Sequence, residues 1–89
     1  MPLTADDLEA AFATSNQEDL ASFEFDDGIG KYTGHVVHRD FRGVSIPDRQ
    51  RIAWEVLRRR FGEDSQQVSL VLTYSPAEWE EIGEPDQAA

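Results

Sequence analysis

The chain has 89 residues, of which 39% are hydrophobic, which is enough apolar material for one compact domain but not for two. With 18 acidic and 8 basic residues it carries a formal net charge of −10, so its overall field repels nucleic-acid phosphates and anionic lipid. The sequence contains no cysteine, which excludes disulfides, a thiolate nucleophile and sulfur ligands for zinc or an iron–sulfur cluster.

Export and membrane signals are not recognisable in the sequence. No apolar run approaches the roughly 20 residues that cross a bilayer, and the start MPLTADDLEAAF lacks the cationic and apolar blocks of a signal peptide. We therefore expect a cytoplasmic protein. Lys31 is the only lysine and the other seven cations are arginines, a composition that indicates either a halophilic protein or a small acidic protein from a GC-rich genome.

Local signals predict a helix at the start of the chain and a β-hairpin after it. Thr4 is a suitable N-cap with Asp7 three residues later, and apolar residues follow at helical spacing, so we expect a helix from about residue 5 to 13. Apolar and polar residues then alternate in LASFEF, and DDGIG supplies a tight turn. The second strand is expected over about residues 31–41, but its alternation does not decide which face is buried.

The stretch FRGVSIPDRQRIAWEVLRRRFG predicts the longest helix of the chain. Ser45 is its N-cap, Pro47 lies where a missing N–H costs nothing, and Gly62 ends it. Apolar residues cover about half of the helical cylinder and form a packing face. This face comprises Ile52, Ala53, Val56, Leu57 and Phe61, with Trp54 at its margin. Arg49 and Arg60 lie at the two ends of the apolar arc, so we expect both to extend their guanidinium groups to water.

The C-terminal part predicts a strand and a short helix. VSLVLTY alternates over residues 68–74 and gives a strand with one strongly apolar face, made of Val68, Leu70, Leu72 and Tyr74. SPAEWEEI repeats the Ser-Pro capping pattern and predicts a terminal helix, whereas residues 83–89 have nothing to bury and are expected to be disordered. The elements together predict one α+β domain over residues 1–82, with a three-stranded sheet packed on helices.

Two separate segments resemble the BolA-like protein family. FRGVSIPDRQR is similar to that family's F-x-G-x-S-x-x-x-R-x-R signature, and QVSLVLTYSPAEW is similar to its third strand followed by T-P-x-E-W. The resemblance covers about residues 36–79 and implies a small domain similar to the class II KH fold, with an α-β-β-α-β core. This element order agrees with the order expected from the local signals.

The resemblance implies a non-enzymatic stress or regulatory module that binds a protein partner, a monothiol glutaredoxin in many family members. Such pairs share a [2Fe–2S] cluster, for which the family uses a histidine before the third strand and a Cys or His between the first two strands. Gln67 stands at the first position, and His35 is the only candidate metal ligand near the second. We therefore expect altered or lost cluster ligation and no resident cofactor. The partner-binding residues implied by the resemblance are Gly34, His35, Gln67 and Tyr74.

Nucleic-acid binding as a KH-like transcriptional regulator is the alternative function. It would use the cationic start of the long helix and the residues just before it, although the net charge opposes it. The residues concerned are Arg39, Arg42, Gly43, Arg49 and Arg51. Enzymatic chemistry is not indicated, because no Ser-His-Asp order, phosphate-binding glycine loop or metal-ligand spacing is present. His35 and His38 are three residues apart on an expected strand, so they point to opposite faces.

Overall fold

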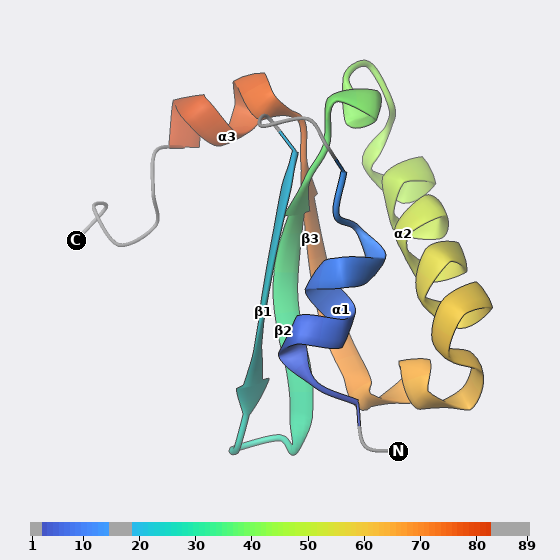
Figure 1. Ribbon diagram of the computed structural model, residues 1–89. Helices are drawn as coiled ribbons and strands as arrows, with labels where there is room; N and C mark the ends of the chain where they lie inside the picture. The colour runs from blue at the N-terminus through green and yellow to red at the C-terminus, as the bar shows by residue number, and fades with distance from the viewer. Residues whose placement is uncertain (1–2, 15–18, 83–89) are drawn as a thin grey trace.

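The computed structural model describes residues 3–14 and 19–82, and the expected disordered tail lies outside this range. These residues form a small α+β domain in which a mixed three-stranded sheet packs against helices (Figure 1). The elements in chain order are α1 (Ala5–Ala11), β1 (Leu20–Asp26), β2 (Lys31–Val37), a 3₁₀ turn (Arg39–Phe41), α2 (Ile46–Phe61), a second 3₁₀ segment (Gly62–Gln67), β3 (Val68–Tyr74) and α3 (Pro76–Ile82). None of the helices built by the described residues is long and apolar enough to span a membrane.

Helix α1 begins as its capping signals predict and ends two residues earlier than expected. The Thr4 side chain accepts a hydrogen bond from the Asp7 amide, and the Asp7 carboxylate accepts one from the Thr4 amide. At the other end the Phe12 amide donates to the carbonyls of Glu9 and Ala10, which tightens the last turn and closes the helix at Ala11. Leu8 is fully buried, and Ala5 and Phe12 pack against the core beside it, so apolar contacts and the cap hold this short helix.

The hairpin forms as predicted, but β2 is shorter than expected. The Asp26 carboxylate accepts from the Gly28 amide, and Gly30 adopts a φ of 69°, which closes the turn between the antiparallel strands. Strand β2 ends at Val37 instead of continuing to residue 41, because the imidazole of His38 accepts from the Asp40 amide and caps the 3₁₀ turn. The apolar Phe41 that prolonged the predicted alternation is instead a buried residue of this turn.

Strand β3 contains a register shift that the sequence pattern did not predict. It runs parallel to β2, with Tyr32 opposite Val68 but Thr33 opposite Leu70, so Ser69 is an extra residue. The shift places both Val68 and Val71 in the core. The predicted apolar face is therefore wrong, since Leu70 and Leu72 lie on the side of the sheet away from the core cluster and are exposed.

The core lies between the sheet and the pair of helices α1 and α2, which cover the same face (Figure 1). Its buried members are Leu3, Leu8, Phe23, Val36, Phe41, Ala53, Leu57, Val68 and Val71. Fully burying a side chain such as Leu57 stabilises the fold by about 1.5–3 kcal/mol. Gly34 is required on this face, because a Cβ there would collide with the Phe23 ring and the Ser22 carbonyl oxygen.

Both outer edges of the sheet carry side-chain hydrogen bonds from the helices. On β1, the Phe23 amide donates to the Glu9 carboxylate of α1 at 3.0 Å. On β3, the Val71 carbonyl accepts from the Gln50 side-chain amide of α2 at 2.7 Å, and the Thr73 carbonyl accepts from Arg49 at 3.5 Å. These bonds occupy backbone groups that an added strand would need, so they oppose extension of the sheet at its edges.

Candidate functional site

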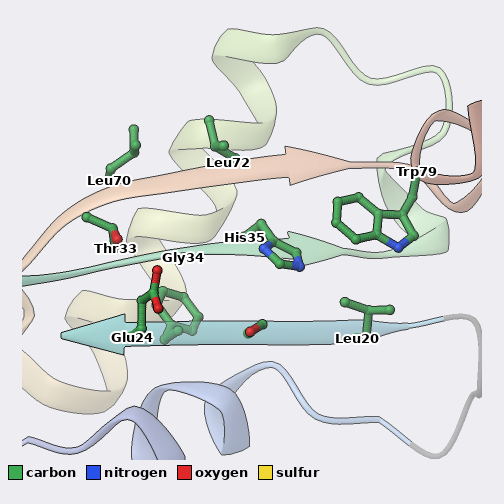
Figure 2. A pocket seen from close by; sticks show the side chains of 10 residues that line it. Leu20, Glu24, Thr33, Gly34, His35, Leu70, Leu72 and Trp79 are labelled. Carbon is green, nitrogen blue, oxygen red and sulfur yellow. The ribbon is translucent and has the colours of Figure 1, made fainter. Parts of the chain in front are cut away.

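Within residues 3–14 and 19–82, the face of the sheet opposite α1 and α2 has no second layer of helices over most of its area, and we call it the open face (Figure 1). It is a shallow depression of about 580 Å³. The residues whose side chains line it are Leu20, Ser22, Glu24, Thr33, His35, Leu70, Leu72 and Trp79 (Figure 2). Three leucines are substantially exposed there, Leu20 at 38%, Leu70 at 47% and Leu72 at 45%. These leucines give the face an exposed apolar surface beside polar side chains.

Strand register fixes the arrangement of the open face. Ser22 lies opposite His35, and His35 lies opposite Leu72, so these three residues form one row across the sheet. The neighbouring row toward the hairpin turn contains Glu24, Thr33 and Leu70. The apolar side chains are thus concentrated on β3, and the charged residue is on β1.

An aromatic cluster closes one end of the open face. The rings of His35 and Trp79 stack with centroids 4.6 Å apart and an interplanar angle of 23°, and Tyr74 lies 5.3 Å from Trp79. Burial lowers the pKa of the His35 imidazole, so the neutral ring is favoured near neutral pH. Trp79 belongs to α3, so the position of this short helix determines how much of the sheet stays open.

Helix α3 is held by an ion pair with α2. The Arg49 guanidinium contacts both carboxylate oxygens of Glu78, at 2.5 and 3.2 Å, and its Nε donates to the Val44 carbonyl at 2.8 Å. The hydrogen bond from Arg49, together with those from Ser75, lowers the pKa of the Glu78 carboxyl to about 2. The expectation that the Arg49 head extends to water is wrong, since the residue is buried and bridges two helices.

The structure brings together only part of the partner-binding set implied by the resemblance. His35 and Tyr74 lie in the aromatic cluster at the open face. Gly34 precedes His35 on β2, but this position has to be glycine because a Cβ there would collide with Phe23 on the core side of the sheet. Gln67 precedes Val68, which pairs with Tyr32, so it lies four residues, or about 13 Å, along the sheet from His35 at 3.3 Å per residue. Its amide donates to Asp64 at 3.4 Å.

The described residues contain no cluster of three or more potential metal-ligating side chains. His35 is a single imidazole stacked against Trp79, and Gln67 does not approach it. The two positions through which the family's cluster would be held therefore do not converge, and the residues present do not fit a [2Fe–2S] group.

His38 takes part in a separate polar network at the end of β2. Its Nε2 lies 3.4 Å from the Asp19 carboxylate, whose side chain is only 1% exposed, and its Nδ1 accepts from the Asp40 amide. Burial raises the pKa of the Asp19 carboxyl, but hydrogen bonds from the Arg39 amide and the Thr14 hydroxyl outweigh this effect, and the net pKa is lowered. Both imidazole nitrogens face these partners, so the network joins β1 to the 3₁₀ turn and does not resemble a nucleophile with its base.

The residues proposed for nucleic-acid binding differ in their exposure and in their partners. Arg49 is buried in its contacts with Val44 and Glu78. Arg51 is exposed but pairs with Asp48 at 2.8 Å. The others are Arg39 and Arg42, which are exposed, and Gly43, whose φ of 75° serves the turn before α2.

Sequence reasoning missed most of the open face. Of the residues that line it, only Gly34 and His35 were assigned to partner binding, and Leu70 and Leu72 were assigned to one apolar face together with Val68, which is in fact in the core. The signal that could have found them is the VSLVL segment, which has apolar residues on both sides of the strand and therefore cannot bury all of them against one layer of helices.

Comparison of the chain with family models, curated protein sequences and solved structures finds no match. The structure by itself establishes a small α+β domain with a mixed sheet and an open apolar face.

Proposed function

We propose that this protein is a non-enzymatic, cytoplasmic interaction module of the BolA-like type, and that it binds a protein partner through the open face. The observation that carries the proposal is the exposure of Leu20, Leu70 and Leu72 on one sheet face, beside an aromatic wall built by Trp79. Covering a leucine that is now half exposed releases water from apolar surface, which favours association. The described polar clusters hold structural positions, so binding is the activity that the surface supports best.

A monothiol glutaredoxin is the first partner to test, because the signature segments resemble a family that binds such proteins. The geometry favours a complex that does not depend on a cluster ligand from this chain. Complex formation is therefore expected with cluster-free as well as cluster-loaded glutaredoxin. The heterodimer would be followed by size-exclusion chromatography and calorimetry, and the cluster by visible circular dichroism, in a salt-rich buffer.

A pair of variants distinguishes the open face from other apolar surface. Leu72→Ser removes an open-face side chain that is 45% exposed, and Ile52→Ser removes one on α2 that is 42% exposed. We expect the first to weaken the complex and the second to leave it unchanged. No complex with either form of glutaredoxin, or equal weakening by both variants, contradicts the proposal for this partner. Duplex DNA is titrated in parallel at low and high salt, and binding that depends on Arg39 and Arg42 would favour the nucleic-acid alternative.

A further inference from the structure

The open face is suited to one kind of occupant, and we infer that it receives a cationic amphipathic helix of the partner protein. The inference rests on the proposed function and adds the secondary structure and charge of the docking segment. Three observations carry it: the closed sheet edges, the dimensions of the open face and the distribution of charge.

The closed edges disfavour docking as an added strand. Such docking uses the free backbone groups of an outer strand. Here Glu9 occupies the Phe23 amide on β1, while Gln50 and Arg49 occupy the Val71 and Thr73 carbonyls on β3. A partner that added a strand would first have to displace these side chains, whereas a partner on the face of the sheet would not.

The dimensions of the open face match a short helix. Three strands spaced about 4.8 Å apart are roughly 10 Å wide, which is close to the diameter of a helix with its side chains. From Leu70 to Tyr74 the strand advances about 13 Å, which is somewhat more than two helical turns. Trp79 limits the face at one end (Figure 2), so a docked helix has a defined stopping point.

The charge of the open face indicates which polar residues the docked helix should carry. Among the described side chains that line the depression, Glu24 is the one carboxylate, and no lysine or arginine lines it. All seven arginines of the chain lie between Arg39 and Arg60, on α2 and the segment before it, and α2 covers the other face of the sheet (Figure 1). The whole chain carries a net charge of −10 even with these arginines counted, so lysines or arginines flanking an apolar stripe complement this surface.

The test uses a synthetic peptide of leucines and lysines with leucine at helical spacing, and a matched peptide with glutamate in place of every lysine. Binding to the full chain is measured by fluorescence anisotropy and located from amide NMR shifts. We expect the lysine peptide to become helical, to shift the amides of Leu20, His35 and Leu72, and to lose about tenfold in affinity with Leu72→Ser but not with Ile52→Ser. Glu24→Gln should reduce the preference for the lysine peptide over the glutamate peptide.

Shifts confined to α2, equal binding of the two peptides, or a bound peptide in extended form would each overturn the inference. The outcomes also separate it from the proposed function. If glutaredoxin binds but the peptide does not bind at the open face, the helix inference is refuted and the proposed function as a protein-binding module still stands. Peptide binding at the open face without glutaredoxin binding supports the inference and transfers the search to other partners with a basic helix.

Discussion

Replacing Arg49 by methionine tests whether this arginine is structural or part of a ligand surface. The substitution keeps much of the side-chain volume. It removes the Arg49 Nε, which in the natural chain donates to the Val44 carbonyl at 2.8 Å, so that carbonyl loses its donor. It also leaves the buried Thr73 carbonyl without its Arg49 partner, and a buried acceptor without a donor costs about 1–3 kcal/mol. Because the Glu78 side chain is 41% exposed, water can replace its lost partner, and we count only the Arg49 contacts with the backbone. The expected loss of stability is about 2 kcal/mol.

Urea unfolding followed by far-ultraviolet circular dichroism measures this loss, and a thermal scan should show a midpoint lowered by about 8–16 °C for a domain of this size. Arg51→Met is the matched control, since Arg51 lies on the same helix, is exposed and makes only a surface pair with Asp48. Its effect should stay within about 0.5 kcal/mol. Equal stability of the two variants would refute the assignment of Arg49 to the structural link between α2 and α3.

Two further predictions concern the sheet and the α3 contact. Gly34→Ala should destabilise the fold by about 1–3 kcal/mol, because the added Cβ would collide with the Phe23 ring. Ser22→Ala, on the open face, is the control and should be nearly neutral. The two variants are compared by their urea unfolding midpoints, and similar midpoints would contradict the packing described. Glu78 has its folded pKa lowered from 4.5 to about 2, so its contribution to stability is complete above about pH 4.5 and is lost as the pH falls toward 2. The stability of Glu78→Gln should therefore depend less on pH in this window than that of the natural chain, and parallel pH profiles would be inconsistent with the Arg49 pair.

Much of the fold could be predicted from the sequence because its signals are local. Thr4 and Ser45 cap their helices by contacts within three residues, and Gly62 ends α2 with a φ of 59°. Such signals depend on short-range hydrogen bonds and backbone preferences, which are encoded in neighbouring residues. The hairpin turn and the start of α3 were predicted for the same reason.

The errors occur where distant parts of the chain decide the outcome. The shift at Ser69 depends on pairing with β2, and the burial of Arg49 depends on Glu78, which is 29 residues away. Periodicity within one strand or one helix contains no information on these partners. The open face was missed for a related reason, since a strand with leucines on one side looks like a core strand until the position of the helices is known.

The hydrogen bonds at the two sheet edges also bear on self-association, because the protein exposes leucines on one face of its sheet. A sheet with exposed apolar side chains and free outer strands can grow by adding strands from other copies at its edges, and amyloid fibrils have that geometry. Here the side chains of Glu9 and Gln50 bond to backbone groups of the two outer strands, so an added strand would first have to break these bonds. We therefore expect a variant that lacks these two side chains to aggregate more readily than the natural chain.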